Sequence, residues 1–205
     1  MDYVFESHKQ AQTILESPKY FPLFSEVLES ISEITDKEII ETFEAGKPAK
    51  GLAHTLNKLL KRELTSRNWN AESPIFQSAE YSTHKIWRLD FAKDTISIEV
   101  SFNHGEAIAW NLLKPVMASG RNHIQKQIET EIGIVICATN ELKKAGNFDD
   151  ATGEFEKICR YLVPLEAALP CPLLIIGLKA PKSFEVVGQK VGQKNIGQVR
   201  RFENL

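Results

Sequence analysis

Apolar residues recur at helical spacing through the first third of the chain. Val4, Ala11 and Leu15 form one run and residues 23–31 form a second, with prolines marking the break between them. Residues 52–69 form a third amphipathic run, which places leucines on one side and basic residues on the other. This pattern predicts helices and no strands over the first 45 residues, and a mainly helical region up to residue 70.

The rest of the chain alternates between strand and helix patterns. Period-two alternation runs over residues 85–102, and the continuous apolar segments 132–138 and 172–178 are typical of strands buried on both faces. Proline-interrupted helical patterns lie at residues 106–118 and 154–169. Helices before and between these strands predict an α/β fold of mixed α+β type, in which helices flank a central mixed sheet.

Polar residues separate these elements and dominate the C-terminal end. Residues 70–78 and 143–153 are predicted to be connections, and frequent glycine and glutamine at residues 188–198 predict a loosely held segment. We therefore expect a single domain over residues 1–181, followed by a basic tail over residues 182–205.

Composition and charge narrow the class of protein. The chain of 205 residues is 42% apolar and 25% charged, which predicts an ordinary buried core. Its net charge of −2 is unevenly divided: residues 1–45 hold ten acidic and three basic residues, whereas residues 179–205 hold six basic and two acidic ones. A polyanionic partner would therefore face the tail and not the N-terminal part, although two solvated surfaces explain the charges equally well.

No segment indicates a membrane or an oxidising compartment. The apolar stretch 162–178 contains Glu166 and three prolines, so it cannot be a spanning helix, and the first residues lack the features of a secretory signal. We therefore expect a cytoplasmic protein with no membrane partner. Cys137, Cys159 and Cys171 are widely spaced and odd in number, so we expect buried thiols and not disulfides or zinc ligands.

The alternating segment predicts a hairpin with an acidic pair. Along residues 95–102 apolar and polar positions alternate, so Glu99 lies on the polar face, away from the core. Folding back at a two-residue loop of Asp94 and Thr95 places Asp90 opposite Glu99 on that same face. The same register pairs Phe91 with Ile98 and Leu89 with Val100.

Two carboxylates at that spacing repel each other and need a cation or a shared proton. Asp90 and Glu99, with a backbone carbonyl and waters, would make the octahedral oxygen site that Mg²⁺ prefers. A metal there would polarise a phosphoryl oxygen and activate water, as phosphodiester hydrolysis requires. The competing interpretation is an exposed hairpin that carries Arg88, Asp90 and Glu99 as a surface salt bridge.

The segment DFAKDTISIEVSF, residues 90–102, resembles the active-site hairpin of one group of type II restriction endonucleases. These are the enzymes related to BglII and BstYI, relatives of BamHI within the PD-(D/E)xK nuclease superfamily. The resemblance continues in order through residues 106–114, 132–142 and 172–181, and it is thin over the N-terminal helices. It implies a PD-(D/E)xK nuclease-like catalytic core over residues 83–181.

By this resemblance, Asp90 and Glu99 are the ligands of a Mg²⁺ ion and the carbonyl of Val100 is a third. An upstream polar ligand is also implied, and both Glu72 and Gln77 fit that place in the sequence.

Ser101 departs from the family pattern, because the resembling enzymes carry glutamine, glutamate or lysine two residues after the glutamate. A serine hydroxyl can hold a water by a hydrogen bond, but it is a poorer base and brings no positive charge. We expect Ser101 to be a tolerated catalytic residue, with slow cleavage as the alternative.

Several polar residues outside the hairpin are candidates for DNA contact. Asn103 and His104 follow the second strand, and a polar loop that mixes donors with acceptors could read base edges. A functionless surface histidine and an ordinary loop are the alternatives. The loop candidates are Lys143, Lys144, Asn147 and Asp149, and Arg121, Asn122 and His123 are candidates for phosphate contact.

These features together predict a homodimeric, Mg²⁺-dependent endonuclease that cuts double-stranded DNA at a short palindrome. The resemblance implies a site with a GATC core. A catalytically impaired DNA-binding protein of the same fold is the main alternative, and a helical interaction module is the third.

Overall fold

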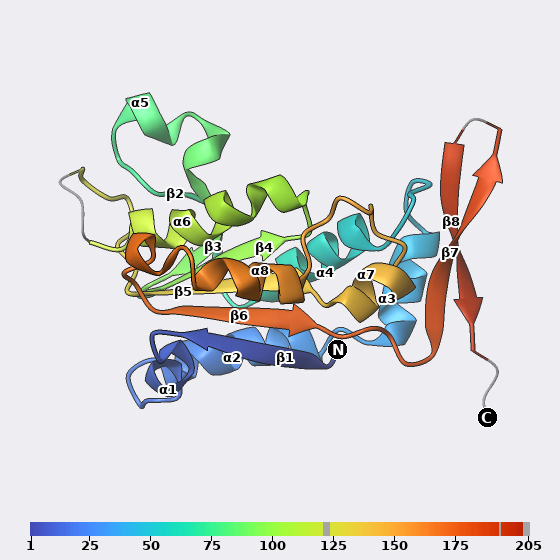
Figure 1. Cartoon of the computed structure of the whole chain (residues 1–205), viewed down its shortest axis with the longest axis horizontal. Helices are drawn as coiled ribbons and strands as arrows, with labels where there is room; N and C mark the ends of the chain where they lie inside the picture. The colour runs from blue at the N-terminus through green and yellow to red at the C-terminus, as the bar shows by residue number, and fades with distance from the viewer. Residues whose placement is uncertain (121–123, 193, 203–205) are drawn as a thin grey trace.

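The computed structural model describes residues 1–120, 124–192 and 194–202, and its centre is a six-stranded sheet (Figure 1). The strand order is β1-β6-β5-β4-β3-β2, and two further strands, β7 and β8, form a separate hairpin. The strands of the sheet are β1 (Tyr3–His8), β2 (Asn70–Pro74), β3 (Arg88–Lys93), β4 (Ile96–Ser101), β5 (Ile132–Ala138) and β6 (Leu173–Leu178). Those of the hairpin are β7 (Phe184–Val191) and β8 (Lys194–Arg201).

The central strands are parallel and the outer ones antiparallel, so the sheet is mixed. β4, β5 and β6 run parallel to one another, while β1 pairs antiparallel with β6, and β3 pairs antiparallel with both β4 and β2. Every residue of β5 and β6 is buried, which is why both read as unbroken apolar runs. The predicted α/β fold with a mixed sheet flanked by helices is confirmed.

Helices cover both faces of the sheet. One core forms between the sheet and the N-terminal helices with α7, and a second between the sheet and α6 and α8. The helices are α1 (Ala11–Leu15), α2 (Phe21–Ser32), α3 (Asp36–Glu44), α4 (Ala53–Ser66), α5 (Ala79–Ser82), α6 (Ile108–Ala118), α7 (Asn140–Ala145) and α8 (Phe155–Leu162). Short 3-10 turns are η1 (Lys85–Trp87), η2 (Gly105–Ala107) and η3 (Glu166–Ala168).

The prediction of helices alone over the first 45 residues is wrong for the start of the chain. Residues 3–8 form strand β1, which adds to the edge of the sheet beside β6. Tyr3 and Phe5 from this strand pack against the core. So short an edge strand is recognisable only once its partner is in place, because six residues carry too little periodicity.

Other boundaries also differ from the predictions. The connection predicted at residues 70–78 contains β2, which pairs with β3, and α7 overlaps the start of the loop predicted at 143–153. α8 ends at Leu162, earlier than predicted, because Pro164 has no backbone N–H to continue the helical hydrogen bonds.

Residues 184–191 and 194–201 form paired strands, so the prediction of a loosely held segment is wrong for the described part of residues 188–198. β7 and β8 pair along their full length, and Figure 1 shows the hairpin at one end of the molecule, apart from the main sheet. Phe184 and Val186 anchor it in the core, while glycines face each other at Gly188 and Gly197. Because few large apolar residues hold the hairpin against the core, its sequence shows only a weak strand pattern. A single domain over residues 1–181 remains a prediction.

The remaining expectations concern membranes and thiols. Among the described residues, no helix has both the length and the apolar character that a membrane span requires. All three cysteines are free thiols: Cys137 and Cys171 are buried, whereas Cys159 is half-buried. The expectation of buried thiols is therefore confirmed for two of the three.

Ile176 in β6 tests the importance of the larger core. Its side chain is fully buried between the sheet and the N-terminal helices. Ile176→Ala should lower the free energy of unfolding by about 2–5 kcal/mol, because it loses buried contacts and leaves a cavity. Ile86→Ala, at a site that is 55% exposed, should change it by less than about 0.5 kcal/mol. Urea unfolding measures both, and equal losses would contradict this account of the core.

Candidate active site

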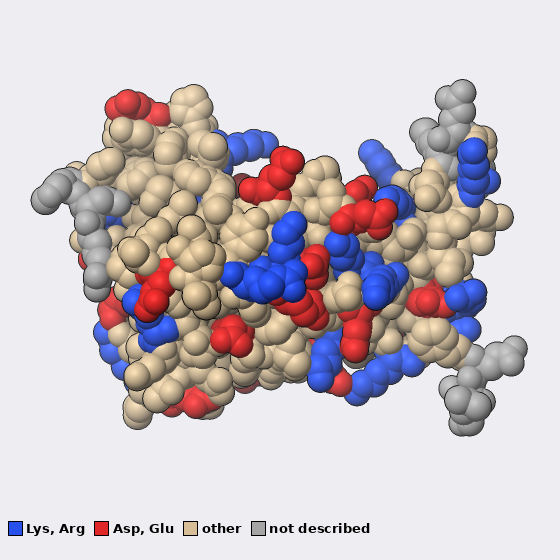
Figure 2. Space-filling view, in the orientation of Figure 1, with Lys and Arg blue, Asp and Glu red and all other residues tan. Residues whose placement is uncertain are grey.

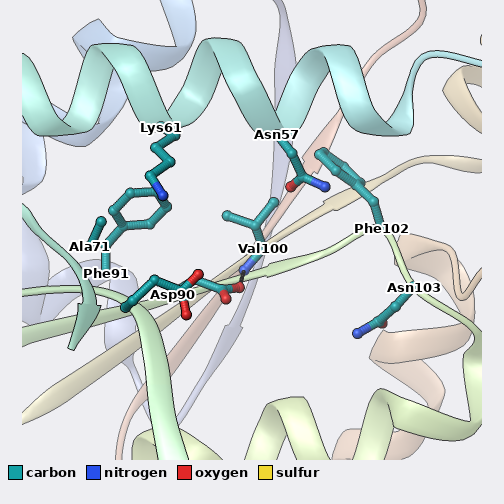
Figure 3. A pocket seen from close by; sticks show the side chains of 9 residues that line it. Asn57, Lys61, Ala71, Asp90, Phe91, Val100, Phe102 and Asn103 are labelled. Carbon is teal, nitrogen blue, oxygen red and sulfur yellow. Dashed lines mark hydrogen bonds between the residues drawn. The ribbon is translucent and has the colours of Figure 1, made fainter. Parts of the chain in front are cut away.

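A pocket of about 310 Å³ opens between α4 and the sheet, at the place where β3 and β4 separate (Figure 3). Asp90 and Val100 lie on the sheet side of this pocket, and Asn57 and Lys61 reach toward it from α4. The other residues that line it are Ala71, Glu72, Phe91, Phe102 and Asn103.

The hairpin that forms the sheet side of this pocket is confirmed in its turn and register. Asp94 and Thr95 make the two-residue loop, and Phe91 pairs with Ile98 as predicted. Asp94 has a φ of 46°, a conformation that aspartate tolerates better than most residues.

The regular pairing ends at Phe91, so Asp90 with Glu99 and Leu89 with Val100 do not continue the ladder as predicted. Side-chain bonds replace it. The backbone N–H of Val100 donates to Asp90 Oδ2 at 2.7 Å, and the N–H of Asp90 donates to Glu99 Oε1 at 3.2 Å. Each carboxylate thus accepts a backbone hydrogen from the opposite strand, which holds the two strands apart and the acids together.

Glu99 lies on the predicted face of the sheet, but that face is not exposed. α6 covers it, so the side chain of Glu99 is only 1% exposed, and Lys114 from α6 forms an ion pair with Glu99 Oε2. The interpretation of an exposed hairpin is therefore wrong. Arg88 does not pair with the acids either, since its guanidinium donates to the carbonyls of Ser82 and Glu72.

Both acids resist ionisation. Burial, reinforced by the charge of Asp90, raises the pKa of Glu99 to about 8 despite the opposing effect of Lys114. Burial also raises the pKa of Asp90, against the hydrogen bond from Val100 and the charge of Lys114. Lys114 therefore compensates the two acids only in part, as expected of carboxylates arranged to receive a further cation.

The structure separates the two candidates for an upstream ligand. Glu72 lies in β2 beside Asp90, lines the pocket, and has a φ of 52°, a conformation that is strained for a glutamate. Gln77 instead donates its side-chain amide to the carbonyl of Lys126. Glu72 is thus the one placed near the acidic pair.

Ser101 is buried on the same face as Glu99, within a small polar cluster. The side-chain amide of Asn111 donates to the Ser101 hydroxyl at 2.9 Å and to Asn103 Oδ1 at 3.1 Å. The Ser101 hydroxyl also donates to Asn103 Oδ1 at 3.4 Å. The serine is therefore held in one orientation by α6.

The candidates for DNA contact form a continuous edge beside the pocket. The backbone of His104 pairs with that of Thr152, and the N–H of Gly153 donates to the carbonyl of Asn103, so two segments distant in sequence lie side by side. Arg121, Asn122 and His123 lie outside the described residues.

Several side chains of this edge already have partners. Asn147 donates to the carbonyl of Lys50 at 2.6 Å, and Asp149 forms an ion pair with Lys50. Lys143 donates to two loop carbonyls and lies 3.2 Å from Glu154, whereas Lys144 is exposed. Lys143 therefore shapes the loop, and its contact with DNA remains a prediction.

The donor set fits a hard cation with few protein ligands. Among the described residues, no group of three or more histidine, cysteine, aspartate or glutamate side chains is arranged to hold a metal ion. Asp90 and Glu99 supply two carboxylates, and the carbonyl of Val100 is adjacent. Mg²⁺ commonly binds through one or two carboxylates and keeps several waters or phosphate oxygens, so the residues present fit such an ion.

Sequence reasoning missed the roles of Lys114 and Asn111. Both lie on α6, one turn apart, and both point to the polar face of β4. The helical pattern of residues 106–118 was visible, but which strand it would cover was not.

The raised pKa of Glu99 predicts how stability changes with pH. Between the ordinary value of 4.5 and about 8, the folded protein holds a proton that the unfolded chain has lost. The free energy of unfolding of the metal-free protein should therefore fall as pH rises from about 5 to about 9, and fall less in Glu99→Gln. Urea titrations in a chelator measure this. The loss of the ion pair with Lys114 lowers the stability of the variant at every pH. The comparison is therefore between the slopes of the free energy of unfolding against pH. Identical slopes in the two proteins would contradict the raised pKa of Glu99.

Comparisons with known proteins show the fold and the family of this chain. A family model described as restriction endonuclease BglII/BglIII matches residues 3–178. The crystal structure of restriction endonuclease BglII complexed with a DNA 16-mer is similar, with a TM-score of 0.68 and 15% identity. That of free BglII has a TM-score of 0.58 and 14% identity, and both comparisons cover 98% of this chain and 100% of the other. No curated protein sequence matches the chain.

At such low identity the solved structures establish the fold, whereas the family model spans most of the chain and establishes the family. The chain belongs to the BglII/BglIII family of restriction endonucleases and is thus a type II site-specific deoxyribonuclease.

Proposed function

We propose that this protein hydrolyses phosphodiester bonds of double-stranded DNA at a short palindrome, with Mg²⁺ bound by Asp90, Glu99 and the carbonyl of Val100. Family membership implies a divalent metal cofactor. One observation carries the assignment to these residues. Asp90, which lines the pocket, and Glu99, which is buried next to it, are held together by backbone hydrogen bonds, and both have raised pKa values.

The reaction makes one bond and breaks one. The oxygen of a water bonds to phosphorus, the bond from phosphorus to one sugar oxygen breaks, that oxygen takes up a proton, and the other proton of the water is released. The chemistry that a divalent ion supplies when bound is polarisation of a phosphoryl oxygen and a lower pKa of water. Asp90 and Glu99 hold their carboxylates in fixed positions, and Ser101, which accepts from Asn111 and donates to Asn103, has one lone pair left to accept a hydrogen bond from water.

Recognition would use the edge beside the pocket. We assign DNA contact to Asn103 and His104, and to the neighbouring loop with Lys143, Lys144, Asn147 and Asp149. Figure 2 shows basic side chains on the β7–β8 hairpin and mixed charges over the rest of this face. A two-fold symmetric homodimer would match a palindrome, with one strand cut by each subunit, and a GATC core is the first site to test.

A catalytically impaired DNA-binding protein is the second candidate. Ser101 favours it, because serine is uncharged and buried where the related enzymes carry glutamine, glutamate or lysine. Digestion of unmethylated plasmid with Mg²⁺, beside gel retardation with Ca²⁺, separates the two. Discrete fragments support the endonuclease, and retardation alone supports the binder.

The acidic pair gives the first test of mechanism. Asp90→Asn and Glu99→Gln should each abolish plasmid cleavage, because each removes metal affinity. Specific DNA binding should stay intact or tighten, because less negative charge repels the phosphates. Asp94→Asn, in the exposed turn of the same hairpin, is the matched control and should cleave normally. Cleavage near the wild-type rate in either active-site variant would overturn the assignment.

Ser101 gives the second test. Ser101→Ala should slow single-turnover cleavage by roughly tenfold to a hundredfold, since it removes one hydrogen bond that orients water. Metal affinity should not change, because the ligands are its neighbours. Ser97→Ala, at a buried serine on the same strand and face, should leave the rate unchanged. A Ser101→Ala enzyme as fast as the wild type would show that the serine has no catalytic role.

A further inference from the structure

The acidic pocket raises a question of charge balance. A phosphate that enters it approaches Asp90, which lines the pocket and whose N–H donates to the buried Glu99, and Ser101 adds no positive charge. Two lysines flank the acids from opposite faces of the sheet: Lys114 from α6 and Lys61 from α4.

Lys114 is already committed to other partners. It pairs with Glu99, its ammonium donates to the carbonyl of Arg88 at 3.1 Å, and its side chain is only 11% exposed. Contact with a phosphate would require it to leave both partners. Its role is to neutralise Glu99 within the protein.

Lys61, unlike Lys114, is neither buried nor paired with another described residue. It lies one helical turn after Asn57 on α4, is exposed, and reaches into the pocket on the side of Asp90 (Figure 3). Its ammonium makes no hydrogen bond or ion pair with any other residue in the described part of the chain. The two arginines nearby are neutralised, since Arg62 pairs with Glu38 and Glu63, and Arg67 pairs with Glu33 and Glu63.

We propose that Lys61 is a further catalytic residue, whose ammonium binds a non-bridging oxygen of the scissile phosphate. The inference rests on the proposed function and deepens it. An anion between Lys61 and a cation at Asp90 would be attracted from both sides, and a phosphodiester is the anion that this enzyme class brings to such a pocket. Charge grows on the equatorial oxygens during phosphoryl transfer, so a fixed ammonium there stabilises the transition state. No proton transfer by Lys61 is involved.

Single-turnover cleavage with saturating Mg²⁺ is the first readout. Lys61→Met should reduce the rate by about a hundredfold, as expected for loss of one group that stabilises transition-state charge. Lys58→Met is the matched control, because Lys58 is exposed on the same helix but does not line the pocket, and its rate should stay within about threefold of wild type. Lys61→Arg should recover part of the lost rate, because it restores the positive charge. Equal rates for the two Met variants would overturn the inference.

DNA binding with Ca²⁺ in place of Mg²⁺ is the second readout and does not depend on cleavage. Replacing the scissile phosphate by a neutral methylphosphonate should weaken binding of wild type at least about tenfold more than binding of Lys61→Met, because only wild type has that contact to lose. The same replacement one nucleotide away should affect both proteins equally. Coupling at the neighbouring phosphate instead would overturn the assignment to the scissile phosphate.

Failure of this inference differs from failure of the proposed function. A wild-type protein that neither cuts nor binds DNA overturns both. A wild-type protein that cuts, together with a Lys61→Met variant that cuts equally well and shows no coupling to the phosphate, overturns only the role of Lys61.

Discussion

The active-site end of this molecule depends on one electrostatic constraint, which is that two carboxylates share a largely buried place in the sheet. Asp90 and Glu99 cannot both be charged there without compensation. The backbone N–H groups of Val100 and Asp90 supply part of it and Lys114 supplies more, yet the pKa values of both acids stay raised. Because these bonds replace the ladder, β3 and β4 separate and the pocket opens between them. The same interactions thus hold the acids in place and create the space beside them.

Helices α6 and α4, which lie on opposite faces of the sheet, contribute differently to this site. α6 lies against β4 and brings Lys114 and Asn111 to the buried polar side chains of Glu99 and Ser101. α4 packs its leucines on the other face, yet one of its polar positions, Lys61, reaches over the pocket. On the α6 face, the positive charge of Lys114 is paired with Glu99 inside the protein. On the α4 face, Lys61 lines the pocket and forms no ion pair among the described residues.

The low identity to BglII is consistent with this division of roles. At 15% identity the fold persists, with a TM-score of 0.68, because sheet order and helix packing require only apolar residues at suitable positions. The active site requires more. It needs the acids on neighbouring strands, a backbone that orients them and a balance of nearby charge. Ser101 departs from the pattern that the sequence resemblance implies, and a hydrogen bond from Asn111 fixes its side chain.

The sequence by itself determined the α/β class, the buried strands β5 and β6, the turn at Asp94 and the proximity of Asp90 to Glu99. Periodicity, apolar runs and turn chemistry are local properties, so they can be recognised in the sequence alone. Only the tertiary structure decided that Glu99 is buried and that Glu72 rather than Gln77 adjoins the site. It likewise decided the partner of Lys114, the edge strand β1 and the β7–β8 hairpin. Each of these depends on contacts between segments far apart in the chain, and burial and pKa follow from the elements that pack there.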